Sequence, residues 1–296
     1  MFLTVCLNPT LQKTLCFPVI VTGSVNRTAE HRLDVSGKGI NVTRVLTQLG
    51  KKALHLTQLG GHMQPLFLSL CEQDGLSVEW VESESQIRFC YTVINGSNGD
   101  VTELIEESEP VSPGTEERLM EKFNLFLESS SLHTTHSTLH TIISGTKAAG
   151  FSDAVIPTMV CKAKEKGLFV ILDIKGNDLK ECLKYEPDII KPNLEEFIDT
   201  FKTEPSKDLL IEITQKHKCG VILTDGSRKI LAADKDSYYE VEVPSVKVVN
   251  TIGSGDAFTA GLASALSDKA DFNTAINEGI RYGALNAGLI KPGVIR

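Results

Sequence analysis

The stretch Asn250-Thr-Ile-Gly-Ser-Gly-Asp-Ala-Phe-Thr-Ala-Gly261 joins an extended run, residues 238–249, to an apolar helical run, residues 257–266. Gly253 and Gly255 permit backbone angles and a close approach that a side chain would block. The first amides of a helix have no partner within it, and together with the helix dipole they favour a phosphate or a developing anion. Asp256 falls in the first helical turn, where a carboxylate can accept a proton from an attacking hydroxyl. The alternative is a plain strand-to-helix turn in which Asp256 is a favourable first-turn charge.

Composition limits the classes of protein that this chain can represent. Its 296 residues, 41% apolar and 23% charged, suit one large α/β domain or two smaller ones. A net charge of −8 argues against a nucleic-acid partner, and no apolar run approaches the length of a membrane span. The first residues are typical of a strand and not of a signal peptide. The seven scattered cysteines form no Cys-x-x-Cys pair, so we expect a cytoplasmic enzyme with reduced thiols.

Helical and strand patterns alternate through most of the chain, which predicts a parallel sheet with helices on both faces. We expect strands at 2–7, 53–60, 141–144, 168–173, 189–190 and 220–224, and helices at 40–49, 66–74, 116–127, 154–166 and 257–266. The stretch 129–137, rich in Ser, Thr and His, is expected to be a polar loop. Ligands bind at the carboxyl ends of such strands, so the polar residues there should share one cleft with the 253–256 turn: Asn8, Ser144, Asp173, Asn193 and Thr224.

A second, smaller sheet is expected from β-prone segments outside this alternation. Residues 87–94 and 101–105 are joined by Asn-Gly turns and predict a hairpin, and residues 14–21 are also β-prone. We therefore expect an α/β core made of residues 1–9, 36–85 and 106–296, with a β lid made of residues 10–35 and 86–105.

Two glycine-rich turns far apart in the chain give the most specific signal. No Walker sequence is present, and Phe258 stands where a dinucleotide fingerprint needs its last glycine. The upstream turn is Ser36-Gly-Lys-Gly-Ile-Asn-Val-Thr-Arg44. Together with Asn8-Pro9, Lys191-Pro-Asn-Leu-Glu-Glu196 and the 253–256 turn, it resembles the phosphofructokinase B family of ribokinase-like sugar kinases. The resemblance runs from the first strand to the last helix, and its nearest branch acts on phosphorylated hexoses (1-phosphofructokinase and tagatose-6-phosphate kinase).

The resemblance implies a ribokinase-like three-layer α/β/α core with a mostly parallel sheet and a small β-sheet lid. It implies ATP-dependent phosphorylation of a phosphorylated ketohexose, fructose 1-phosphate or tagatose 6-phosphate, with ATP and Mg²⁺ as cofactors, by a homodimer. Asp256 would be the base, and the amides of Gly253, Ser254 and Gly255 would stabilise the transferring phosphoryl group. The implied substrate-binding residues are Gln12, Arg27, Gly37, Lys38, Gly39, Asn41, Arg88 and Thr146. The implied ATP-binding residues are Asn193, Thr224, Gly226 and Asn286, and Glu196 would reach magnesium through water.

Several of these residues have a structural alternative. Gly37 and Gly39 could form a helix-entry turn, and Asn193 with Glu196 has the spacing of a capping box. The Thr224-Asp-Gly226 segment could be an ordinary turn, Asn286 a helix-surface residue, and Arg27 and Arg88 solvated charges. The three histidines at 133, 136 and 140 lack the spacing of a helical zinc pair, so we expect no zinc site there.

The chain departs from the family pattern mainly on the sugar side. Gln12 stands where the family has an aspartate that holds sugar hydroxyls, and Ser36 replaces a glycine. Gly145-Thr-Lys-Ala148 replaces Gly-Ser-Leu-Pro and adds Lys147. These departures keep two alternatives open: a kinase of an unphosphorylated sugar or nucleoside, and a non-catalytic relative that binds a sugar phosphate.

Overall fold

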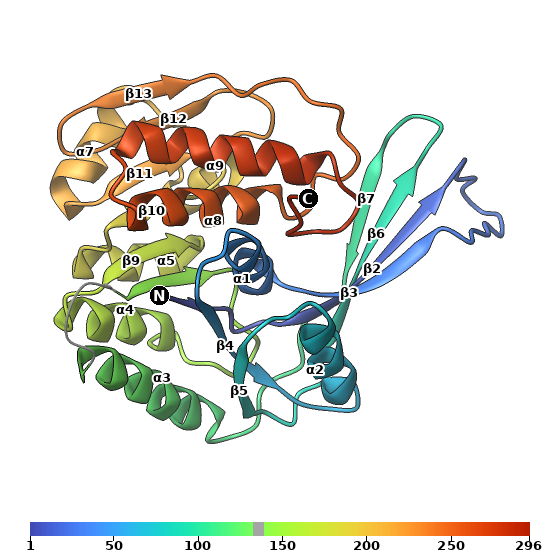
Figure 1. Cartoon of the computed structure of the whole chain (residues 1–296), viewed down its shortest axis with the longest axis horizontal. Helices are drawn as coiled ribbons and strands as arrows, with labels where there is room; N and C mark the ends of the chain where they lie inside the picture. Colours follow the sequence, from blue (N-terminus) through green and yellow to red (C-terminus); the bar gives the residue numbers. More distant parts are fainter. Residues whose placement is uncertain (133–138) are drawn as a thin grey trace.

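The computed structural model describes residues 1–132 and 139–296, and it contains a large sheet and a small sheet (Figure 1). The large sheet has nine strands in the order β13-β12-β11-β10-β9-β8-β1-β4-β5. The pairs from β11 to β5 are parallel, and β12 and β13 add an antiparallel edge. The strands are β1 (Phe2–Val5), β4 (Ala53–Leu59), β5 (Val78–Glu82), β8 (His140–Ser144), β9 (Phe169–Asp173), β10 (Ile189–Ile190), β11 (Gly220–Leu223), β12 (Ile230–Ala233) and β13 (Tyr238–Val241).

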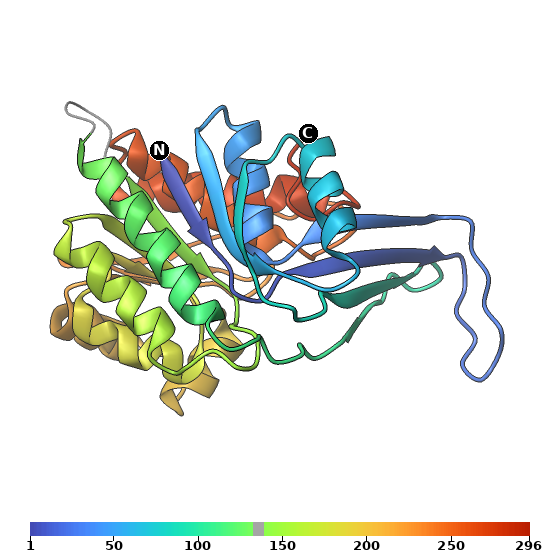
Figure 2. The same ribbon diagram turned by 90° about the horizontal axis from the view of Figure 1, so that it is seen from below.

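Helices cover both faces of the large sheet (Figures 1 and 2). One face packs against α1 (Lys38–Gln48), α8 (Ser254–Ser267) and α9 (Phe272–Ala287). The other packs against α3 (Thr115–Leu132), α4 (Val155–Glu165), α5 (Gly176–Cys182), α6 (Leu194–Phe201) and α7 (Lys207–His217), with a 3-10 turn at Leu183–Tyr185. Neighbouring strand residues point to opposite faces, so that Ile142 joins one apolar cluster and Ile143 the other. This confirms the predicted three-layer α/β/α architecture with a mostly parallel sheet.

The small sheet projects from one side of the core (Figures 1 and 2). It pairs β3 (His31–Ser36), β2 (Thr10–Phe17), β6 (Arg88–Asn95) and β7 (Val101–Ile105) in that order. The four strands lie within residues 10–36 and 88–105. At its base, Leu11 and Val35 pack with Ile40 and with Phe67 of α2 (Gln64–Gln73). No helix in the described part of the chain is long and apolar enough to cross a membrane.

Some boundaries differ from those expected. The extended run 238–249 stays in the sheet only to Val241, because Pro244 lacks an amide hydrogen and the amides of Val249 and Asn250 donate to the Ala287 carbonyl instead. Helix α3 continues to Leu132, so the expected polar loop at 129–137 is wrong in its first residues, and its remainder lies outside the described residues. Four elements were not predicted: β5, β12, α5 and α7.

The histidine stretch offers little for a metal. His133 and His136 lie outside the described residues. His140 is buried between the rings of Phe2 and Phe169, with centroids 5.2 and 5.1 Å away. Burial lowers the pKa of His140 to about 4, so the imidazole is neutral and serves packing.

Helices α8 and α9 cross at a glycine, which gives a stability prediction. A β-carbon on Gly261 would lie 2.6 Å from Tyr282 Cδ2 and 2.8 Å from the Glu278 carbonyl oxygen. Gly261→Ala should therefore lower the free energy of unfolding by about 1–3 kcal/mol, although alanine is the better helix former. Urea unfolding measures the change. Gly288→Ala is the control, since its β-carbon would meet nothing closer than 3.5 Å, and an equal loss in both variants would contradict the steric argument.

Candidate active site

The turn at residues 253–256 keeps hydrogen-bond donors available. Gly253 has a φ of 84°, and a β-carbon there would lie 2.8 Å from the amide nitrogen of Gly293, so the position needs glycine for two reasons. The first hydrogen bond closing the turn of α8 runs from the Ala257 amide to the Gly253 carbonyl at 2.8 Å. The amides of Gly255 and Asp256 precede it, whereas the Ser254 amide donates to the Thr251 carbonyl at 3.2 Å. The hydroxyl of Ser254 is buried and has no partner among the described residues. This set of donors fits a phosphate group.

Asp256 is a buried carboxylate in the first turn of α8. The side-chain amide of Asn41 donates to its Oδ2 atom at 2.8 Å. Burial and the negative charge of Asp173 raise the pKa of Asp256 to about 6, while Lys38, Asn41 and Lys191 oppose the rise. The group is ionised at neutral pH and is more basic than an exposed aspartate, which suits a general base.

A second buried carboxylate, Asp173 at the end of β9, organises the cations beside Asp256. It accepts from Lys38 at 2.9 Å and Thr259 at 2.9 Å, and it forms an ion pair with Lys191 at 3.0 Å. Burial favours the neutral acid, but the two lysines outweigh it and lower the pKa of Asp173 to about 2. For Lys38, burial alone would lower the pKa, and Asp173, Glu196 and Asp256 together raise it. Lys38 and Asp173 therefore remain charged.

Asn193 and Glu196 form the predicted capping box at the start of α6. The Glu196 amide donates to Asn193 Oδ1 at 2.8 Å, and the Asn193 amide donates to Glu196 Oε2 at 3.0 Å. The other Glu196 oxygen, Oε1, accepts from Lys38 at 3.0 Å. Thr224 lies beside them, since its carbonyl accepts from the Leu194 amide at 2.9 Å. Capping thus explains Asn193 and Glu196 in part, and the contact with Lys38 also brings Glu196 into the cationic cluster.

The sugar-side residues gather where β1 and β8 end. Asn8 donates from its side-chain amide to the Thr146 hydroxyl at 3.1 Å, across the point where the strand order of the sheet reverses. Gly37 begins α1 with a φ of 110°. Gly39 has a packing role, because a β-carbon there would lie 2.6 Å from His55 Cε1.

Arg88 lies at the start of β6, where the small sheet leaves the core. One guanidinium nitrogen donates to the Glu106 carbonyl at 3.3 Å, but Nε is buried and lacks a partner among the described residues. The backbone of Arg88 pairs with Thr10, whose hydroxyl donates to the Arg88 carbonyl at 3.1 Å, so Arg88 enters the small sheet beside the segment that follows β1. Arg88 is thus not a freely solvated charge.

Other expected site residues lie elsewhere. Arg27 is exposed in the loop between β2 and β3, at the outer end of the small sheet (Figure 2), and the structure of one chain does not bring it to Asp256. Gln12 is buried within the small sheet and donates to Thr92 at 2.7 Å. Gly226 lies in an exposed turn. Asn286 is fully buried, not a helix-surface residue, and donates to the carbonyls of Lys291 and Val294 at 3.2 and 2.9 Å.

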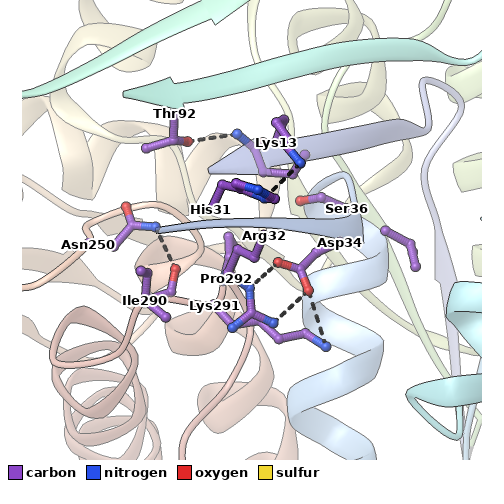
Figure 3. A network of polar contacts seen from close by, with 12 residues as sticks. Lys13, His31, Arg32, Asp34, Ser36, Thr92, Asn250, Ile290, Lys291 and Pro292 are labelled. Atoms are coloured by element: carbon purple, nitrogen blue, oxygen red, sulfur yellow. Dashed lines mark hydrogen bonds and ion pairs between the residues drawn. The ribbon is translucent and has the colours of Figure 1, made fainter. Parts of the chain in front are cut away.

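Sequence reasoning missed a charged network at the base of the small sheet. Asp34 stands opposite Gln12 in the β2–β3 register. Arg32 donates to Asp34 at 2.5 and 2.8 Å, and Lys291 lies 3.5 Å from it (Figure 3). Lys291 also contacts Asp74. The alternation of charge in β3 was the only sequence signal, and it does not identify partners from the C-terminal segment.

A buried carboxylate at an anion-binding helix start, beside charged lysines at the carboxyl ends of a parallel sheet, defines an α/β phosphotransferase. The chain belongs to the pfkB family of carbohydrate kinases, whose family model matches residues 11–292. It is therefore an ATP-dependent sugar kinase that uses a divalent metal, which confirms the family recognised from its motifs.

Solved structures share this fold at low sequence identity. Phosphofructokinase-2 from Escherichia coli in complex with fructose-6-phosphate has a TM-score of 0.85 and 22% identity, over 97% of this chain and 93% of that one. The same enzyme in a tetrameric inhibited form gives the same TM-score, identity and coverage. A possible 1-phosphofructokinase from Thermotoga maritima has a TM-score of 0.84 and 19% identity, over 97% and 91% of the two chains. At these identities the similarity establishes the fold.

The metal requirement fits the residues present. Among the residues that the structure describes, no group of three or more His, Cys, Asp or Glu side chains could hold a metal ion. Magnesium keeps much of its water and commonly binds proteins through one or two carboxylates plus substrate phosphates. Glu196 is a carboxylate of this kind at the edge of the cleft. Magnesium would neutralise charge on the phosphates of the nucleotide.

The raised pKa of Asp256 gives a stability prediction. Between about pH 4 and about pH 6 the unfolded chain has released this proton and the folded chain still holds it, so folding weakens as pH rises. Asp256→Asn should increase the free energy of unfolding at neutral pH by on the order of 2 kcal/mol, and the gain should disappear below about pH 4. Urea unfolding across this pH range measures it. The control is Asp236→Asn at an exposed position, whose difference from wild type in unfolding free energy should not depend on pH. If the difference between Asp256→Asn and wild type grew as pH fell, the argument would be refuted.

Proposed function

We propose that this kinase phosphorylates a phosphorylated ketohexose, fructose 1-phosphate or tagatose 6-phosphate. The observation that carries the proposal is the buried Nε of Arg88, which has no partner among the described residues. Arg88 pairs with Thr10 in the β2–β6 register, two residues along the chain from Asn8, which contacts Thr146. A partly buried guanidinium whose Nε has no partner among the described residues suits a phosphate group on the sugar. The resemblance of the motifs to the hexose-phosphate branch supports the same substrate class.

The reaction follows from the arrangement of charged groups. Asp256 accepts the proton as the sugar hydroxyl oxygen forms a bond to the terminal phosphorus, and the bond from that phosphorus to the bridging oxygen breaks to leave ADP. Asn41 holds Asp256 Oδ2, which leaves Oδ1 for the proton. The amides of Gly253, Gly255 and Asp256 and the Ser254 hydroxyl stabilise the negative charge of the phosphoryl group in flight. Lys38 and Lys191 add positive charge on the other side.

The nucleotide base has a candidate pocket beside α9. A pocket of about 350 Å³ lies between this helix and residues 242–246, with an apolar lining that includes Val246, Ile280, Ala284 and Leu285. Such a lining suits a planar aromatic base. Asn193, Thr224 and Gly226 then bind the remainder of ATP, while Asn286 acts by holding the C-terminal segment behind the pocket.

The small sheet serves as a lid and as a dimer surface in this proposal. Its outer strands and loops expose apolar side chains, namely Val19, Val21, Val25, Leu104 and Ile105. Burying them against a second copy removes this surface from water. Closure of the lid excludes water as a competing acceptor. Arg27, remote from the site of its own chain, is expected to act in the dimer, and all seven cysteines are free, which suits the reducing cytoplasm.

The test of the proposed function is ADP release across a substrate panel. Fructose 1-phosphate or tagatose 6-phosphate should be used at the highest kcat/KM, ahead of fructose, ribose, adenosine and fructose 6-phosphate. Asp256→Asn should bind ATP normally and turn over about 10²–10⁴-fold more slowly, because the base is lost. Near-normal turnover in this variant would remove Asp256 as the base. Calorimetric binding of a sugar phosphate with no ADP release would favour the non-catalytic alternative.

Arg88→Ala should separate the two substrates. We expect the KM for the sugar phosphate to rise about tenfold or more with the KM for ATP unchanged, because a charge-assisted hydrogen bond to phosphate contributes about 1.5–3 kcal/mol. Arg118→Ala is the control, since that arginine is exposed on α3 and contacts the Glu82 carbonyl. An effect of Arg88→Ala on ATP alone would overturn the assignment.

A further inference from the structure

Arg44 is a buried arginine on α1 whose donors reach four separate segments. Its Nε atom donates to Asp74 at 3.0 Å. Its Nη1 atom donates to Asn41 Oδ1 and to the Pro292 carbonyl, each at 2.9 Å. Its Nη2 atom donates to the Val35 carbonyl at 2.6 Å. Arg44 thus fixes its own helix against β3, the end of α2 and the C-terminal segment.

The contact with Asn41 decides which way that amide faces. A guanidinium can only donate hydrogen bonds, so the Asn41 atom that meets it must be the carbonyl oxygen. The amide nitrogen is then directed to Asp256 Oδ2, 2.8 Å away. Ser36 does not decide the orientation, because its hydroxyl lies 3.4 Å from Oδ1 and 3.3 Å from Nδ2 and can serve either.

We propose that Arg44 is a positioning residue that fixes the amide orientation of Asn41 and, through it, the ionisation and direction of the Asp256 carboxylate. With Arg44 in place, Asn41 donates to Asp256 and stabilises its charged form. With the amide reversed, a carbonyl oxygen would face the carboxylate and raise its affinity for a proton. The inference rests on the proposed role of Asp256 as the base.

The other groups that face Asp256 come from different elements. Asp173 at the end of β9 raises the pKa of Asp256, and Lys38 of α1 and Lys191 after β10 lower it. The described contacts of these three side chains do not include Arg44. The hydrogen-bonded path from Arg44 to the Asp256 carboxylate therefore runs through Asn41.

The test is the pH profile of kcat at saturating substrates in Arg44→Lys. Lysine keeps a positive charge near Asp74 but loses the fork that also reaches Asn41. The acid limb of the profile should move up by about one pH unit, so that the variant is about fivefold slower near pH 6, about tenfold slower below about pH 5, and recovers as pH rises. A loss of equal size at every pH would mean a purely structural role and would overturn the proposal.

Two further variants make the test specific. Asp74→Asn removes the same ion pair without touching Asn41, so it should lower stability and leave the acid limb in place. Asn41→Leu leaves Arg44 intact and removes the hydrogen bond to Asp256. It should move the acid limb of the kcat profile to higher pH, as Arg44→Lys does. This variant tests the role of Asn41 even if the arginine variant does not fold. The inference is overturned if the acid limb of the kcat profile does not move in Asn41→Leu. It is also overturned if the limb moves as far in Asp74→Asn as in Arg44→Lys. If Asp256→Asn turns over normally, the proposed function fails instead.

Discussion

The chemistry of the site depends on two buried carboxylates that lie beside two lysines, the buried Lys191 and the part-exposed Lys38. Asp173 stays ionised because Lys38 and Lys191 bind it from two sides. Its charge in turn raises the pKa of Asp256 and makes that carboxylate more basic. Without the lysines, burial would drive Asp173 to its neutral form, and Asp256 would lose part of the repulsion that raises its proton affinity. The basicity of Asp256 is therefore a property of the whole cluster.

The parallel sheet makes this cluster possible, because it brings the carboxyl ends of distant strands to one edge. Lys38 is 135 residues from Asp173 and 158 residues from Glu196, yet it contacts both. The close approach of α1 to the sheet requires Gly39, which lies against His55. The capping box of α6 fixes Glu196 on the other side of Lys38. The fold thus uses ordinary packing and capping to hold the part-exposed Lys38 between two carboxylates.

Local features were predictable from sequence and long-range partners were not. The turn at 253–256 and the start of α1 are set by glycine and by helix ends, which leave a clear pattern in a few residues. The pairing of Lys38 with Asp173 and the contacts of Arg44 leave no such pattern, because ion pairs have no fixed spacing in the chain. Short strands such as β5 and β12 also escaped prediction. A family resemblance can also predict a contact that a single chain does not form. Arg27 was expected to bind the substrate, but the loop that contains it lies at the outer end of the small sheet.

The departures from the family pattern bear on substrate choice more than on catalysis, and their contacts explain why. Lys147 is neutralised by Asp178 and Asp153 at 2.5 and 3.0 Å, so it adds no free charge to the cleft. Gln12 is satisfied by Thr92 inside the small sheet, which replaces a carboxylate facing sugar hydroxyls with an internal contact. Of these departures, Ser36 is the one that contacts Asn41, the partner of Asp256. Its hydroxyl can form a hydrogen bond with either orientation of the Asn41 amide. Since each new side chain finds its partner within the chain, the surroundings of Asp256 are retained while the sugar side changes.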